Sequence, residues 1–292
     1  MNSSFIHKHP VLTYFVLTLL ISWSSLVLIM GPGGFIGATE VPAEQTPVLI
    51  LAMLLGPTIA GLSMTGLIHG RAGFGELLAR LRRWRVGMVW YLVAILTAPL
   101  LVAAASLVLL TSSPAFVPGI VTASEKVTLI VFGLIAGTLV GIFEEIGWTG
   151  FAIPRLRQRY GILATGVILG LVWGLWHLPL FASSARTSQR IPPILTLAVM
   201  LFSFLPAFRV LMVWVYDRTQ SLVVAMLMHL SQTATALILA IPVTADQTVV
   251  HDLVYAAGLW IFVGVIALAN RGVLERERST QRAANATVAP DA

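Results

Sequence analysis

The sequence predicts an all-α fold: a polytopic transmembrane helix bundle of about eight spans, with one interfacial amphipathic helix. Three observations lead to this prediction. Only 10% of the 292 residues are charged, 58% are hydrophobic, and the mean hydropathy is +0.91, whereas an ordinary soluble domain has about 25% charged residues. This composition excludes a soluble enzyme, a coiled coil and a disordered chain. Because the chain has no cysteine, disulfides, thiolate metal sites and Fe–S clusters are excluded as well.

Eight apolar stretches are long enough to cross a bilayer, which takes ~20 helical residues. The first follows Lys8 and has no cleavage site after it, so we interpret it as an uncleaved span. Between the second and third, residues 73–85 place apolar and basic side chains on opposite helical faces, which predicts a helix lying on the membrane surface. The predicted spans are residues 10–30, 48–68, 87–110, 127–149, 162–181, 194–215, 221–241 and 250–270.

The basic residues predict how the bundle is oriented. With the N-terminus inside, fifteen of the eighteen Lys and Arg residues fall on the inner side, as the positive-inside rule requires. We therefore expect a multi-pass plasma-membrane protein with both termini in the cytoplasm, and the arginine-rich, cysteine-free composition suggests a prokaryotic one. The net charge of +6 reflects this bias and not nucleic-acid binding. We expect a single transmembrane domain over residues 1–271, with a catalytic core at about 125–240, and a disordered cytoplasmic tail at 272–292.

Several ionisable side chains lie inside the predicted spans, where a charge at the helix centre costs about 2.5–3.5 kcal/mol or more. Glu144 and Glu145 occupy the fourth span, His177 the fifth, Arg209 the sixth and His229 the seventh. Glycines at every fourth position mark one face of the fourth and fifth spans, and Glu144 and His177 fall on those faces, toward protein. Direct antiparallel packing of the two glycine faces in full register would leave Glu144 and His177 about 16 Å apart. Two adjacent carboxylates would repel each other, so we expect either that one of them is protonated or that one of them pairs with Arg209.

A carboxylate and two imidazoles on different helices allow two kinds of amide hydrolysis. The carboxylate can take a proton from water while the imidazoles donate hydrogen bonds to the oxyanion. Alternatively, Glu144, His177 and His229 can hold a divalent metal such as zinc with one open position. The sequence contains neither a G-x-S-x-G elbow nor an H-E-x-x-H motif, so any metal site must be assembled between helices. Both routes stay open on the residues alone.

Three motifs resemble those of the CPBP intramembrane proteases, also called the CAAX-protease or Abi family. They are EEIGWTGF from Glu144, WGLWHLP from Trp173, and MH from Met228, with Thr233 four residues after the histidine. The resemblance covers residues 125–240, and the order of the motifs and the helix count agree with it.

The motifs depart from the family pattern at three positions. Thr149 stands where the first motif usually ends in arginine, Trp173 where phenylalanine is usual, and Thr233 where asparagine is usual. The first change removes a positive charge beside the carboxylates, a charge that Arg209 is expected to supply. The last replaces an amide by a hydroxyl, which has one donor and no carbonyl.

The resemblance implies an intramembrane endopeptidase in which a glutamate-activated water attacks a peptide bond of a membrane-associated protein or peptide. Glu144 would be the general base, His177 and His229 would bind the oxyanion or a metal, and Glu145 would support them. The supporting residues are expected to be Arg209, Thr233 and Trp173.

Two other functions compete with this one. A catalytically weak bacteriocin-immunity or scaffold protein would explain the replacements at Thr149 and Thr233. A proton-coupled transporter could use the same carboxylates and histidines as a relay, but residues 1–145 and 146–292 show no internal repeat. The expected partners are a membrane-associated peptide or protein substrate and the lipid bilayer, and no nucleic acid.

Overall fold

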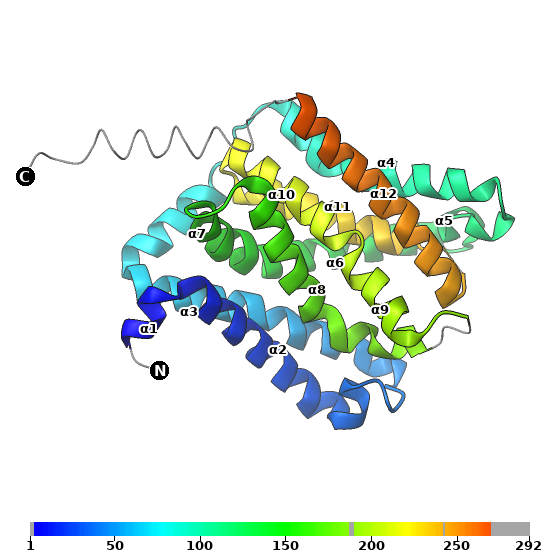
Figure 1. Ribbon diagram of the computed structural model, residues 1–292, viewed down its shortest axis with the longest axis horizontal. Coiled ribbons are helices and arrows are strands. Elements are labelled where there is room, and N and C mark those ends of the chain that lie inside the picture. The colour runs from blue at the N-terminus through cyan, green and yellow to red at the C-terminus, as the bar shows by residue number, and fades with distance from the viewer. Residues whose placement is uncertain (1–2, 187–189, 242, 270–292) are drawn as a thin grey trace, which may run out of the picture.

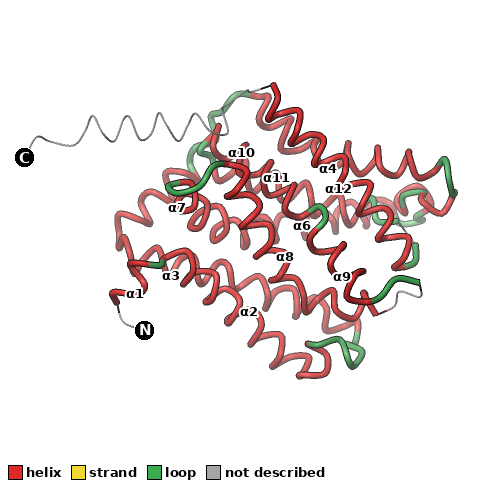
Figure 2. The backbone as a smooth tube through the Cα atoms, in the orientation of Figure 1, coloured by secondary structure: helices red, strands yellow, loops and turns green. Residues whose placement is uncertain are grey.

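The computed structural model describes residues 3–186, 190–241 and 243–269, and this part contains helices and no strand (Figures 1 and 2). The predicted all-α membrane fold is confirmed. Seven helical stretches are long and apolar enough to cross a membrane, and a shorter apolar helix brings the bundle to about eight. The predicted domain end at residue 271 and the tail at 272–292 lie outside the described residues. In chain order the elements are α1 (Ser3–Lys8), α2 (Pro10–Phe35), η1 (Ala43–Gln45), α3 (Thr46–Leu81), α4 (Met88–Leu110), η2 (Pro114–Phe116), α5 (Gly119–Thr122), α6 (Lys126–Gly147), η3 (Trp148–Ala152), α7 (Ile153–Arg157), α8 (Ile162–Arg186), α9 (Pro193–Phe202), α10 (Leu205–Thr219), α11 (Leu222–Ile238) and α12 (Ala245–Ala269).

The bundle has two outer helix pairs and a central group. Helices α2 and α3 lie together along one side, α4 and α12 along the opposite side, and α6, α8, α10 and α11 lie between them (Figure 1). Large apolar side chains such as Leu28, Val127 and Leu268 are exposed on outward faces, as a lipid environment favours. Helix α10 is instead buried along almost its whole length. The centre of the bundle is therefore the place where ionisable side chains can be held away from lipid.

The sixth predicted span, residues 194–215, is divided into two helices. Helix α9 ends at Phe202 and α10 begins at Leu205, with Pro206 in its first turn. Proline lacks the amide hydrogen that would continue the preceding helix, and it is well tolerated in a first turn. The break lets α10 take its own direction through the centre of the bundle.

The predicted interfacial helix is confirmed in part. Helix α3 runs from the second span into this segment through Gly70, whose φ of 53° and ψ of −140° are not helical. Such a φ is favoured by glycine, so the chain can turn there without side-chain strain. Beyond the turn, Phe74 and Leu78 are exposed and Leu77 is buried. The helix ends at Leu81 and not at residue 85 as predicted.

A short π-helix, η3, joins α6 to α7 directly after the two glutamates. Its cause lies in Pro154, which has no N–H to donate to the carbonyl four residues earlier, that of Gly150. Arg80 of α3 compensates by donating to the Gly150 carbonyl at 3.0 Å. π-Helical turns occur often at functional sites, and this one fixes where α6 ends.

Candidate active site

The two glycine-lined helices pack against different partners. On α6, a Cβ atom added to Gly141 would lie 2.6 Å from the carbonyl oxygen of Met226 on α11. On α8, a Cβ added to Gly170 would lie 2.4 Å from the Cα atom of Pro206 on α10. The direct packing of α6 on α8 considered from the sequence is therefore wrong, and its separation of about 16 Å does not apply. Each glycine face lets one neighbouring backbone approach closely.

Glu145 is fully buried and both of its carboxylate oxygens are engaged. Its Oε1 atom accepts from Nη1 of Arg209 at 2.7 Å and lies 2.7 Å from Nδ1 of His229. Its Oε2 atom accepts from the hydroxyl of Thr149. Because three groups already use its lone pairs, Glu145 serves to hold side chains from α10 and α11 in place.

Glu144 has a different environment one residue earlier. Its Oε2 atom accepts from the indole N–H of Trp173 at 2.7 Å and from that of Trp148 at 3.2 Å. Nη2 of Arg209 lies 3.8 Å from the same oxygen. Its Oε1 atom has no hydrogen-bond partner in the described part of the chain. One carboxylate oxygen of Glu144 is therefore held and the other is available.

Arg209 supplies the positive charge between the two carboxylates. Its guanidinium carbon lies 4.0 Å from the centre of the Trp173 ring, and the side chain is fully buried. Thr149 and Arg209 both bind Glu145, so a cation from α10 contacts the carboxylate next to Thr149, the position at which the family motif usually has arginine. Trp173 adds an indole N–H that phenylalanine at this position would lack.

A cavity of about 280 Å³ is lined by five of the predicted site residues, which come from three helices; Glu145 and Arg209 do not line it. Its wall includes Glu144 of α6, Trp173 and His177 of α8, and His229 and Thr233 of α11. Nδ1 of His177 lies 2.8 Å from the carbonyl oxygen of Trp173. A carbonyl only accepts, so Nδ1 carries the hydrogen and the opposite ring nitrogen, Nε2, is left for the cavity. The remaining wall is mainly apolar, contributed by side chains such as those of Met53, Leu180 and Phe181.

Gln232 is a cavity residue that the sequence reasoning missed. It lines the same wall as Thr233, is 7% exposed, and accepts through Oε1 from the hydroxyl of Tyr255 at 2.5 Å. This bond fixes the orientation of the amide, because Oε1 and Nε2 are at opposite ends of it. A signal was present, since a glutamine beside Thr233 within an apolar span needs a polar partner as much as a histidine does.

Among the residues that the structure describes, one buried group of side chains could bind a metal ion. Donor atoms of Glu144, Glu145 and His229 all lie within 4.8 Å of one another. This set contains Glu145 in place of His177, which the sequence analysis had paired with Glu144 and His229. Both oxygens of Glu145 are already bound, and the guanidinium of Arg209 contributes a positive charge at the same point.

Comparison with known proteins gives two matches. Residues 126–235 match the family model of type II CAAX prenyl endopeptidases, Rce1-like. A segment of 42 residues is 43% identical to the CAAX prenyl protease 2 of Methanococcus maripaludis; it makes up 14% of this chain and covers 16% of the length of that relative. The matched range contains all three motifs and every predicted site residue. The resemblance to the CAAX-protease family is thus confirmed over this part of the chain.

Proposed function

We propose that this chain is an intramembrane endopeptidase of the CAAX-protease type, which hydrolyses a peptide bond of a membrane-associated protein or peptide. The observation that carries the proposal is the state of Glu144, a buried carboxylate with one oxygen held by two indoles and the other directed at no protein group. Two imidazoles line the same cavity. A general base needs an available lone pair within reach of its water, and this set supplies it.

The two adjacent glutamates have separate roles in this proposal. Glu144 takes the proton from water through Oε1, and the resulting hydroxide adds to the carbonyl carbon of the scissile bond. Glu145 does not line the cavity; it positions His229 and Arg209 through the contacts at 2.7 Å. The proton held by Glu144 then passes to the leaving amine as the C–N bond breaks. The carboxylate is thereby returned to its starting state.

The histidines bind the two ends of the scissile amide. With a hydrogen on both ring nitrogens, His229 donates one to Glu145 and the other to the oxyanion that forms on the carbonyl oxygen. His177 keeps its Nδ1 hydrogen on the Trp173 carbonyl, so Nε2 of the neutral ring accepts from the peptide N–H. The tryptophan at position 173 serves both carboxylate and imidazole, since its indole binds Glu144 and its backbone binds His177.

Hydrolysis inside a bundle also needs a route for water. A second cavity of about 220 Å³ adjoins the first, and Phe204, Gln232 and Ala236 line both. Polar side chains of Asp252 and Tyr255 contribute to its wall. Polar walls hold water where an apolar cavity stays dry, so we assign this second cavity as the entry for water. The mainly apolar wall of the first cavity suits an apolar segment of the substrate.

Gln232 is expected to donate its amide N–H to the oxyanion. Gln232→Glu keeps the shape of the side chain and the acceptor for Tyr255 but removes the donor. We expect kcat to fall by about a hundredfold, the usual cost of losing one oxyanion donor, with KM little changed. Cleavage kinetics of a labelled membrane-anchored peptide measure both constants. Thr138→Val, which changes an exposed hydroxyl on α6, is the control; a Gln232→Glu rate equal to that of the control would contradict this role.

Chelation is expected to leave activity within about twofold of the untreated rate. A divalent ion held by Glu144, Glu145 and His229 would lower the pKa of a bound water and polarise the substrate carbonyl. Here Arg209 already balances charge at Glu145, and a second cation would be repelled by it. The measurement is the cleavage rate after treatment with 1,10-phenanthroline, beside the metal content of the purified protein. A loss above about tenfold that zinc restores would assign the metal route instead.

The proposed activity is tested by cleavage of a library of membrane-anchored peptides by purified protein in proteoliposomes. The library includes tails with a lipidated cysteine near the C-terminus, because the curated relative is named a CAAX prenyl protease. Wild type and a Glu144→Gln variant are compared side by side. Cleavage at identical sites and rates by both would contradict the assignment.

A further inference from the structure

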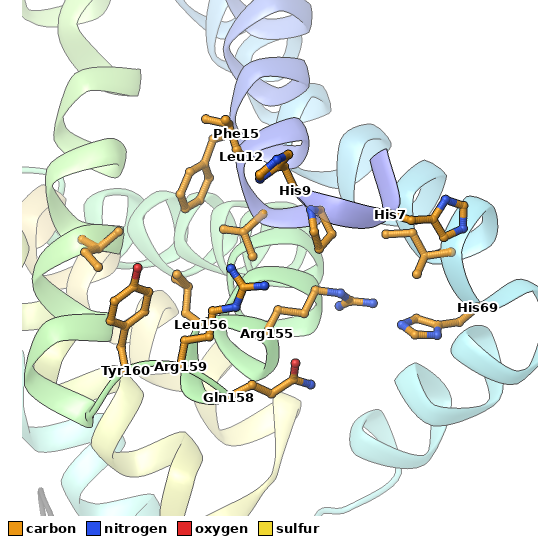
Figure 3. A pocket seen from close by; sticks show the side chains of 14 residues that line it. His7, His9, Leu12, Phe15, His69, Arg155, Leu156, Gln158, Arg159 and Tyr160 are labelled. Atoms are coloured by element: carbon orange, nitrogen blue, oxygen red, sulfur yellow. The ribbon is translucent and has the colours of Figure 1, made fainter. Parts of the chain in front are cut away.

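A second site with polar side chains is a cavity of about 440 Å³. It shares no residue with the cavity of the candidate active site. It is formed by the start of α2, the region of α3 around Gly70, and the segment from α7 to α8 (Figure 3). Five basic or imidazole side chains line it, and its lining contains no carboxylate. We call these five the basic pocket: His7, His9, His69, Arg155 and Arg159.

Neither arginine of the basic pocket forms an ion pair within the described residues, although Glu76, which pairs with Arg80 at 3.2 Å, lies close enough to act electrostatically on Arg155. The side chain of Arg159 has no hydrogen bond or ion pair within the described residues, whereas that of Arg157, two positions earlier, binds Asp217 through two contacts of 2.7 and 3.1 Å. His69 is likewise without a side-chain partner in the described ranges. A pair of arginines with imidazoles around them, in a cavity whose lining has no carboxylate, is an arrangement that attracts an anion.

Arg155 is held in a fixed position at this pocket. Its Nη1 atom donates to the carbonyl oxygen of Phe151 at 2.7 Å, and its guanidinium carbon lies 3.7 Å from the centre of the Phe151 ring. These contacts use one face and one hydrogen of the guanidinium and leave its other donors available. A guanidinium already ordered in this way loses little entropy on binding a phosphate, whose oxygens match its donors.

The other side of the pocket is apolar and open toward lipid. Leu12 and Phe15 of α2 and Ile168 of α8 line it, and Leu12 is 54% exposed. Figure 3 shows Arg155 and Arg159 between Phe15 and Tyr160 on one side of the pocket and His7 and His69 on the other. Both α2 and α8 are long and apolar enough to cross a membrane, so a ligand here has its head among cations and its tail beside the outer helix faces.

We propose that the basic pocket binds the phosphate headgroup of an anionic phospholipid, with the acyl chains lying along α2 and α8. The lipid is favoured over free phosphate because the apolar wall is continuous with the charged one. Arg155 and Arg159 bind the phosphate oxygens, and the imidazoles donate further hydrogen bonds. The site is independent of the proposed hydrolysis, since none of its residues takes part in the chemistry.

The test is native mass spectrometry of the full chain, purified in neutral detergent and mixed with equal amounts of phosphatidylglycerol and phosphatidylcholine. We expect wild type to retain phosphatidylglycerol preferentially. Arg159→Gln is expected to lower the ratio of the two bound lipids about tenfold, the effect of losing one charge-assisted hydrogen bond. If Arg159→Gln gives no folded protein, the exposed His69→Gln variant carries the test, with a change in the same direction.

The matched control is Arg82→Gln, which removes the same charge from an exposed position outside the pocket. An equal lipid ratio in wild type and Arg159→Gln would overturn the proposal, as would an equal loss in Arg82→Gln. A separate arm adds inorganic phosphate alone. Complete displacement of phosphatidylglycerol by millimolar phosphate, with no preference for the lipid, would overturn the assignment to a phospholipid.

Discussion

Replacing Glu144 by glutamine is expected to lower kcat by at least about a hundredfold while the helix bundle stays folded. Glutamine has the same shape, and its carbonyl oxygen can still accept from Trp148 and Trp173, which bind the carboxylate at 3.2 and 2.7 Å. It has no lone pair basic enough to take a proton from water. The loss therefore falls on the chemical step and not on packing. The measurement is single-turnover cleavage of a labelled membrane-anchored peptide, beside the melting temperature of each protein.

Two further variants separate catalysis from structure in this experiment. Glu76→Gln removes an exposed carboxylate that pairs with Arg80 on the same helix, and its rate should match that of wild type. Glu145→Gln removes a carboxylate that binds side chains of α10 and α11, and it should lower the melting temperature as well as the rate. A Glu144→Gln protein that cleaves at the wild-type rate would show that the base lies elsewhere.

The sequence was sufficient to predict the membrane bundle because span length and apolar composition are set by the bilayer itself. The phases of Glu144 and His177 on their glycine-lined helices also predicted correctly that both side chains face protein. The helix partners could not be predicted in this way. Glycines on one helix face indicate that a neighbouring backbone approaches closely. Whether Gly141 contacts α8 or α11 depends on the packing of the whole bundle.

The different contacts of the two glutamates could not be predicted from the sequence either. Glu144 and Glu145 are adjacent, so composition and helical phase barely distinguish them. The two carboxylates differ because Arg209 and His229 both bind Glu145 at 2.7 Å. These residues lie 64 and 84 positions away from Glu145 along the chain. Gln232 was missed for a related reason: its amide becomes informative only when Tyr255 of α12 is seen to bind it.

The break in the sixth span was open to prediction, because Pro206 stands within it. The apolar count over residues 194–215 gave one continuous span, whereas proline chemistry favours a new helix starting close to that residue. This local signal matters for the site, since α10 carries Arg209 and its direction is set by the break. Hydropathy alone therefore located the apolar segment but did not predict that it forms two helices, α9 and α10.

Removing the Arg209 charge is expected to destabilise the protein by about 3–5 kcal/mol, the cost of leaving a buried charge unpaired. Both Arg209 and Glu145 are fully buried, and their ion pair of 2.7 Å is the shortest contact of the guanidinium. In Arg209→Met the side chain keeps its length and apolar character, but Glu145 loses its counter-charge. The measurement is the free energy of unfolding in mixed micelles titrated with sodium dodecyl sulfate.

The double variant Arg209→Met/Glu145→Gln tests whether the stability depends on the ion pair or on each side chain separately. A buried pair replaced by neutral groups of similar volume is often close to neutral in stability, so most of the loss should be recovered, with a coupling free energy above about 1 kcal/mol. Its cleavage rate should stay low, because His229 would lose the carboxylate that positions its ring at 2.7 Å. The stability of Arg209→Lys should fall between that of wild type and that of Arg209→Met. An ammonium keeps the charge but not the stacking on Trp173 or the reach to both carboxylates. Additive losses in the double variant would mean that Arg209 stabilises the bundle by packing, and that Glu145 needs no cation from α10.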